Sequence, residues 1–193
     1  MKKQTHRLAF FNSYDFLVSS YVTLFVIAPI LSNKITNIFG LKILVGVIAL
    51  SIAYGFLDII NNNFGKEKAR QTVVTAAVVR LFVWLFVLFS TFVLPTWKMA
   101  DGYVQFVQQG FRILVAGEAA MVLSQYFLDI PVFDYLKNKT GAFWIRYNLS
   151  NIISQCVSVV LFMTLAFLGT DKPVIQLILS QLVFRILISV VLT

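Results

Sequence analysis

The chain has 193 residues, of which 59% are hydrophobic and 12% are charged, and its mean hydropathy is +0.85. This composition excludes an ordinary soluble domain and indicates an integral membrane protein. The single cysteine excludes an intramolecular disulfide, and the single histidine argues against a His-based metal or haem site. We expect no nucleic-acid partner, because in a membrane protein the net charge of +8 is explained by loop residues that set the topology.

Six apolar segments, each of about 18–26 residues, are long enough to cross a hydrocarbon core about 30 Å thick. In chain order the predicted spans are residues 14–31, 41–60, 71–94, 103–128, 149–168 and 173–192. Gly, Asn, Lys, Pro and Asp mark the breaks between them. The sequence therefore predicts an all-α membrane protein, with one domain over residues 1–193 and six transmembrane helices.

The distribution of lysine and arginine predicts the orientation of these spans. The amino-terminal segment and the even-numbered loops carry nine of these residues, and the odd-numbered loops carry four. Because cytoplasmic loops are enriched in positive charge, both termini are expected to face the cytoplasm. The longest loop, residues 129–146, mixes apolar and charged residues, which predicts a short interfacial helix.

The fifth span carries a polar stripe. Steps of three, four and three residues place Asn148, Asn151, Gln155 and Ser158 on one helical face. Inside a bilayer such a stripe is costly, so it must face protein, water or a ligand. Side-chain amides donate and accept hydrogen bonds side by side, which suits the edge of a planar heterocycle.

The fourth span carries two charged residues on different faces. Glu118 follows Arg112 by six residues, so the two side chains point in different directions and we expect no pairing within the helix. Glu118 instead shares a stripe with Gln125. Charged groups at this depth are candidates for substrate binding, and the alternative is that each pairs with a neighbouring helix to fix packing.

Further polar candidates lie in the remaining spans. Tyr54 and Asp58 form a stripe in the second span, and Gln181 and Arg185 share a face of the sixth. Asp58 lies near the cytoplasmic edge, where a gate or a packing role competes with ligand contact. Arg80, in the third span, is expected to extend toward the cytoplasmic interface.

Catalytic motifs are missing from the sequence. HExxH, GxSxG, P-loop and CxxC patterns do not occur, and a serine nucleophile would lack a histidine base. We therefore expect no enzyme activity and no cofactor. Polar recognition within apolar helices indicates passage of a small molecule through a pocket among the second, fourth, fifth and sixth spans.

Three sequence blocks resemble the queuosine precursor transporter family, a vitamin-uptake-transporter-like group. The first, residues 58–70, has an Asp, an aromatic–Gly pair and a basic Ala-Arg run. The second runs from Arg112 through the Ser-Gln-Tyr-Phe-Leu-Asp stretch at residues 124–129 to Gly141. The third begins at Arg146 and includes Asn-Leu-Ser at 148–150 and Ser-Gln at 154–155. Together they cover most of residues 54–170.

The resemblance implies a carrier of the bacterial inner membrane that imports 7-deazaguanine precursors of tRNA queuosine. The implied substrates are the cyano compound preQ0, the aminomethyl compound preQ1 or the free base queuine. By motif position, the implied substrate-binding residues are Asp58, Arg112, Gln125, Asn148, Asn151 and Gln155. The residue pattern adds Tyr54, Glu118, Gln181 and Arg185, and it leaves a homodimer open.

The chain departs from the family pattern at three positions. Asn62 replaces a common Glu, Ser158 replaces a usual Asp, and Glu118 stands where relatives are expected to be apolar. One hypothesis is that the acidic partner of a cationic ligand has moved to Glu118, and another is that the substrate differs. The alternatives are a substrate-binding subunit of an energy-coupling factor importer and a carrier of another vitamin or nucleobase.

Overall fold

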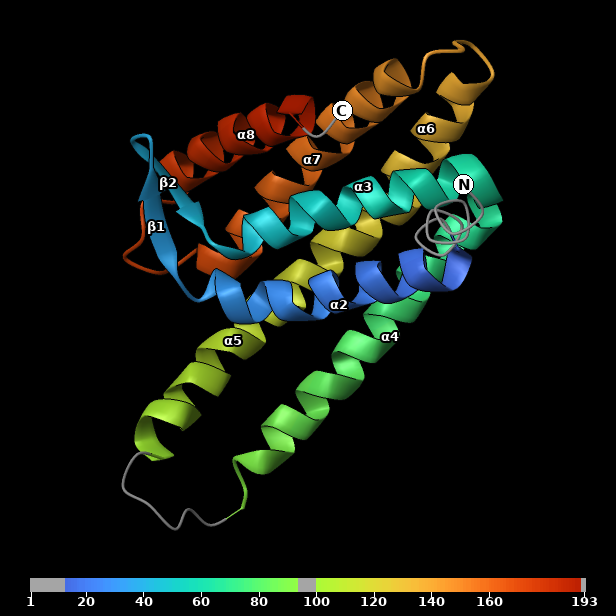
Figure 1. Ribbon diagram of the computed structural model, residues 1–193. Coiled ribbons are helices and arrows are strands. Elements are labelled where there is room, and N and C mark those ends of the chain that lie inside the picture. Colours follow the sequence, from blue (N-terminus) through green and yellow to red (C-terminus); the bar gives the residue numbers. More distant parts are fainter. Residues whose placement is uncertain (1–12, 94–99, 192–193) are drawn as a thin grey trace, which may run out of the picture.

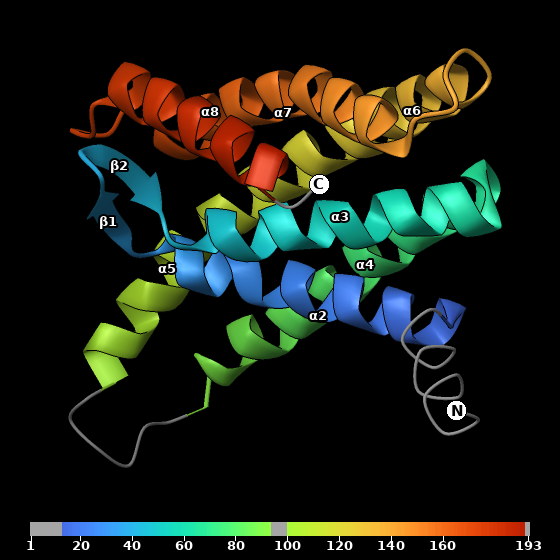
Figure 2. The same ribbon diagram turned by 45° about the horizontal axis from the view of Figure 1, so that its top comes forward.

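The computed structural model describes residues 13–93 and 100–191 of the chain and consists mainly of long helices packed in a bundle (Figure 1). The long helices are α2 (Tyr14–Ser32), α3 (Gly46–Phe64), α4 (Lys66–Ser90), α5 (Ala100–Met121), α7 (Phe143–Phe167) and α8 (Val174–Val191). The π-helix η1 (Val122–Asp129) and helix α6 (Ile130–Lys137) extend α5. In Figure 2, α7 and α8 lie on one side of the bundle, and α3 separates them from α2.

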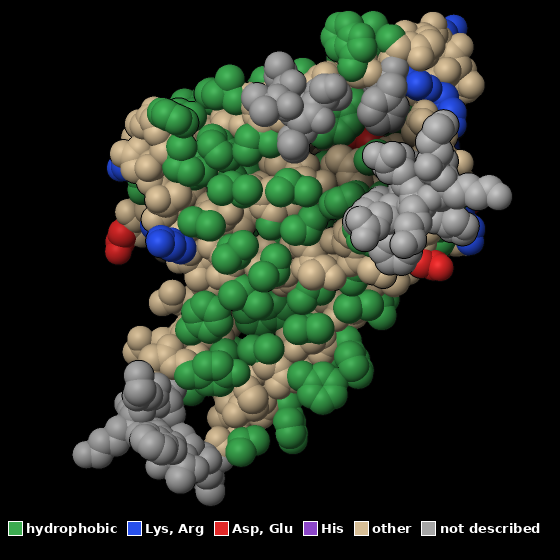
Figure 3. Space-filling view, viewed as in Figure 1, with side chains coloured by type: hydrophobic (Ala, Val, Ile, Leu, Met, Phe, Trp, Pro, Cys, Tyr) green, Lys and Arg blue, Asp and Glu red, His purple; other side chains and the backbone are tan. Residues whose placement is uncertain are grey.

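The expected class of an all-α membrane protein is confirmed. Five helical stretches are long and apolar enough to cross a bilayer, and a shorter apolar helix covers Val174–Ile188. Apolar side chains cover much of the visible face, while charged side chains gather toward the two ends of the helices (Figure 3). The sixth crossing and the cytoplasmic termini stay predictions. The amino-terminal segment and the predicted span ends at residues 94 and 192 lie outside the described residues.

The helices extend beyond the apolar segments that predicted them. Helix α4 begins at Lys66 rather than at residue 71, and α7 begins at Phe143 rather than at residue 149. Apolar runs mark the part of a helix in the hydrocarbon core, whereas the hydrogen-bonded helix continues into the polar interface. As a result, α7 includes Asn148, which the polar stripe had placed on the helix although it lies one residue before the predicted span.

The predicted start of the second span at residue 41 is wrong, because residues 35–44 form a β-hairpin. Strand β1 (Ile35–Ile38) pairs antiparallel with β2 (Leu41–Leu44), with Ile35 opposite Leu44. The two turn residues, Phe39 and Gly40, have positive φ angles of 52° and 81°, as a tight hairpin turn requires. An apolar run of this length does not distinguish a buried strand from the first turn of a helix by periodicity alone.

The helix continues past the predicted end of the fourth span at residue 128, and the short helix expected in the following loop is present as α6, whose interfacial position stays a prediction. The helix continues through η1 and α6, so that one apolar helical stretch covers Gly102–Lys137. The proline near the start of α6 lies directly after the π-helical turn, where the regular pattern of α-helical hydrogen bonds is already interrupted. The π-helical turn changes the direction in which successive side chains point. Ser124, Gln125 and Asp129 are all buried.

The core consists of two apolar clusters that meet at α5. One cluster joins α2, α3 and α4 and includes Tyr21, Phe25 and Leu57; the other joins α5, α7 and α8 and includes Ile113 and Met163. Helices α2 and α3 approach each other closely at Gly46. A Cβ atom at this position would lie 2.2 Å from the Ala28 backbone carbonyl oxygen, so only glycine fits there.

Replacing Gly46 by alanine is therefore expected to destabilise the protein by about 1–3 kcal/mol, because helix backbones must shift to relieve the clash. The matched control is Gly102→Ala in α5, where nothing lies within 4 Å of the added Cβ. That substitution should be neutral or slightly stabilising, since alanine favours a helix over glycine. Thermal unfolding in detergent measures both, and equal midpoints for the two variants would disprove the close contact.

Candidate functional site: a central cavity and its polar surroundings

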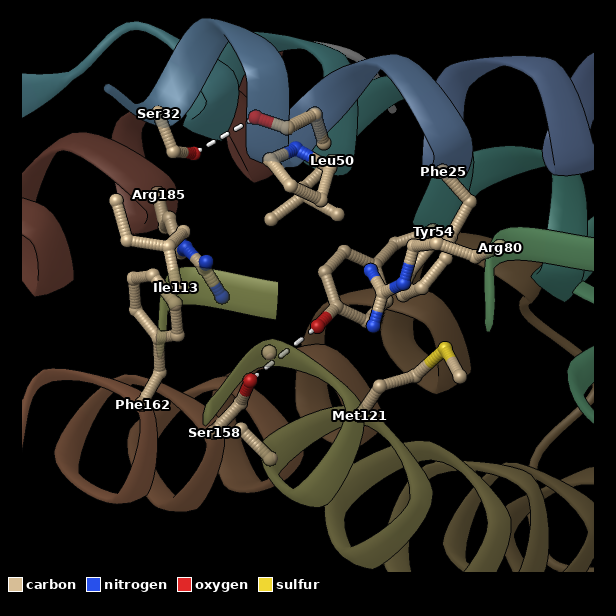
Figure 4. A pocket seen from close by; sticks show the side chains of 14 residues that line it. Phe25, Ser32, Leu50, Tyr54, Arg80, Ile113, Met121, Ser158, Phe162 and Arg185 are labelled. Carbon is tan, nitrogen blue, oxygen red and sulfur yellow. Dashed lines mark hydrogen bonds between the residues drawn. The ribbon is translucent and has the colours of Figure 1, made fainter. Parts of the chain in front are cut away.

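A cavity of about 30 Å³ lies between the two apolar clusters. All six long helices contribute to its walls, including α2 and α4, which the sequence did not predict to take part. The lining residues labelled in Figure 4 are Phe25, Ser32, Leu50, Tyr54, Arg80, Ile113, Met121, Ser158, Phe162 and Arg185. An apolar wall with a few polar groups is typical of a small-molecule site. This volume holds one or two water molecules, so a heterocycle requires the lining side chains to move apart.

Arg185 of α8 is the most unusual residue of the cavity wall. Its side chain is 2% exposed, and its Nε and Nη1 atoms have no hydrogen-bond partner among the described residues. The guanidinium carbon lies 5.9 Å from the ring centre of Tyr54. One turn earlier on the same face, buried Gln181 also has an amide nitrogen without a described partner. Buried donors without acceptors are costly, so this face of α8 offers hydrogen bonds to a ligand.

Arg80 of α4 forms a buried ion pair with Glu118 of α5. The Nε of Arg80 donates to a carboxylate oxygen of Glu118, and the guanidinium lies 4.0 Å from the ring centre of Phe25. The expectation that Arg80 extends to the cytoplasmic interface is wrong, because its side chain is only 2% exposed. Hydropathy predicts how deep a residue lies in a span, but it does not predict which neighbouring helix the side chain contacts. Glu118 therefore pairs with Arg80 of a neighbouring helix, which is the alternative given in the sequence analysis.

The stripe on α7 faces α3 and forms a chain of hydrogen bonds. The amide nitrogen of Asn151 donates to Asp58 Oδ2 at 2.7 Å, and the amide nitrogen of Gln155 donates to Asn151 Oδ1 at 3.1 Å. One turn further, the hydroxyls of Ser158 and Tyr54 lie 3.4 Å apart at the cavity wall. The stripe therefore runs along α7 from a buried carboxylate to the wall of the central cavity.

A second polar group, around η1, was largely missed by the sequence analysis. Tyr21 of α2 donates to Gln125, and Ser154 donates to Asp129 Oδ1 at 3.2 Å. Asp129 was treated as a loop residue because the fourth span was predicted to end before it. Its position four residues after Gln125 is a signal that could have placed it on the same buried face.

Of the ten predicted site residues, two line the cavity, Tyr54 and Arg185, and the other eight do not. Arg112 is exposed and donates to the backbone carbonyls of Leu165, at 3.4 Å, and Leu168, where it caps the end of α7. Asn148 donates to the Trp144 carbonyl of its own helix at 2.9 Å. Gln181 is buried beside the cavity but does not line it. Arg112 instead lines a separate pocket of about 510 Å³ with Gln108 and Lys172.

The apolar helices define a multi-pass membrane protein, and a cavity with an apolar wall and a few polar groups lies between them. A family profile described as "Putative vitamin uptake transporter" matches residues 44–193, and the chain belongs to this family. The queuosine precursor transporters lie within it. No curated protein and no solved structure matches the chain. Because the family consists of transporters, the protein acts in transport of a small molecule across a lipid bilayer and is not an enzyme.

Proposed function

We propose that the protein imports 7-deazaguanine precursors of queuosine through a bacterial inner membrane, and that the substrate binds in the central cavity. The observation that carries this proposal is the set of polar groups at the cavity wall. Arg185 presents donors without acceptors among the described residues, and Tyr54 and Ser158 present hydroxyls beside it. A deazaguanine offers a lactam carbonyl to such donors and a flat face to the rings of Phe25 and Phe162.

The amide network of α7 contributes to this site from one side. Asn151 and Gln155 are bonded to each other and to Asp58, so we assign them to positioning α7 against α3. Gln125 retains a buried amide nitrogen without a described partner, and it can donate to a substrate once the cavity widens. Exposure of the cavity to each side of the membrane in turn then completes transport.

Binding is tested by thermal unfolding of the detergent-purified protein with the cyano- and aminomethyl-deazaguanines, queuine, guanine and riboflavin. A ligand at about one hundred times its Kd stabilises the folded state by about 2.7 kcal/mol, so we expect a clear rise in Tm with at least one deazaguanine. Ser158→Leu, which fills the cavity, should abolish this rise. Arg112→Gln, which lies outside the cavity, should retain it.

The vitamin description of the family supports a second candidate, a carrier of another vitamin or a substrate-binding subunit of an energy-coupling factor importer. A rise in Tm with riboflavin but with no deazaguanine would favour a vitamin substrate. Co-purification of the protein with ATPase subunits would favour the importer subunit over a solitary carrier.

A further inference from the structure

We infer that the central cavity selects ligands that present a hydrogen-bond acceptor or a negative charge to Arg185, and that it discriminates against cationic amines. This inference rests on the proposed role of the cavity as the substrate site and specifies its chemistry. It starts from the guanidinium of Arg185, which is 2% exposed and lines the cavity together with Tyr54 and Ser158 (Figure 4).

The charge of Arg185 has no counter-ion in the described part of the chain. The two ion pairs found there join Arg70 to Glu67 and Arg80 to Glu118. Its Nε and Nη1 atoms also lack hydrogen-bond acceptors among these residues. A buried charge is stable in a membrane interior when it is paired or hydrogen-bonded. A ligand acceptor at this position would therefore supply the hydrogen bonds that the described residues do not supply.

The nearby carboxylates each accept a hydrogen bond from another residue, and none of them lines the cavity. Glu118 is bound by Arg80, Asp58 accepts from Asn151, and Asp129 accepts from Ser154. Arg80 and Glu118 cancel each other, whereas Arg185 leaves one positive charge at the cavity wall. The described lining of the cavity contains no carboxylate, so an ammonium group placed in this space would meet that charge without an acid in the wall to pair with it. Glu118 accepts from Arg80 through one carboxylate oxygen, and its other oxygen has no partner among the described residues, but Glu118 does not line the cavity.

The test compares three deazaguanines that differ in one substituent: a nitrile, a carboxylate and an aminomethyl group. At pH 7 these are neutral, anionic and cationic. We expect the nitrile and the carboxylate to bind at least tenfold more tightly than the amine, and Arg185→Met to remove that preference. Ser158→Asp, which adds an acid to the cavity wall, should shift the preference toward the amine. An amine that binds the unaltered protein as tightly as the nitrile would overturn the inference.

A second readout needs no ligand and separates this inference from the choice of substrate. Arg185→Met removes a buried charge that has no counter-ion among the described residues, so its Tm should equal or exceed that of the unaltered protein. Arg80→Met is the matched control, because Arg80 is equally buried but paired, and its Tm should fall. If the Tm fell equally in both variants, Arg185 would have a structural role and the inference would be overturned. Absence of binding by every deazaguanine would instead refute the proposed substrate.

Discussion

Replacing Arg80 by methionine is expected to lower the free energy of unfolding by about 3–5 kcal/mol, because it leaves the carboxylate of Glu118 in the bundle without its partner. The ion pair joins α4 to α5, and the Arg80 side chain is 2% exposed. Methionine preserves most of the side-chain volume, so the loss reports the charge rather than a cavity. Denaturation by SDS in mixed micelles measures this change for a helical membrane protein.

The double variant Arg80→Met/Glu118→Leu is the control for this prediction. When both charges are replaced by apolar groups, the desolvation penalty of the remaining charge disappears, and most of the lost stability should return. A double variant as unstable as Arg80→Met alone would show that packing around Arg80, including its contact with Phe25, accounts for the effect.

Replacing Asn151 by leucine is expected to destabilise the protein by about 2–4 kcal/mol. Asn151 is fully buried, donates to Asp58 at 2.7 Å and accepts from Gln155 at 3.1 Å. Its removal leaves a buried carboxylate and a buried amide without these bonds, and a charged group makes such a loss expensive. The same SDS denaturation, which follows loss of helix packing, gives the change in unfolding free energy.

Asp58→Asn provides the matching comparison for this bond. In that background the acceptor is neutral, so the cost of Asn151→Leu should decrease by about 0.5–3 kcal/mol, the usual range for residues in direct contact. Additive effects of the two substitutions would mean that Asn151 stabilises the bundle through contacts other than the one with Asp58.

Much of the fold was predictable because the bilayer imposes strong constraints on sequence. Each of the six predicted spans contains one long helix, and the polar stripe of Asn151, Gln155 and Ser158 faces other parts of the protein, as its cost in lipid requires. The hairpin at residues 35–44 and the continuous helix through η1 and α6 were not predictable. The hairpin depends on turn geometry, and the continuous helix depends on the chain staying helical beyond the predicted span. Hydropathy predicts neither.

The candidate site was predicted in part. Tyr54 and Arg185 were selected from their helical spacing, and both line the cavity. The participation of Arg80 was not predicted, because its pairing with Glu118 depends on how α4 meets α5. Arg112 was selected by the same depth argument but lies at the end of α7, outside the cavity. Sequence spacing thus identifies a shared helical face, whereas tertiary packing determines what that face contacts.

The central proposal is tested most directly by uptake of radiolabelled cyano-deazaguanine into proteoliposomes that contain the purified protein. We predict uptake above that of protein-free liposomes, its loss in Ser158→Leu, and its retention in Arg112→Gln, which leaves the cavity lining unchanged. Uptake that is indistinguishable from protein-free liposomes, with a protein whose folding is confirmed by cooperative thermal unfolding, would contradict the proposed substrate. Uptake that persists in Ser158→Leu would contradict the assignment of the central cavity as the binding site.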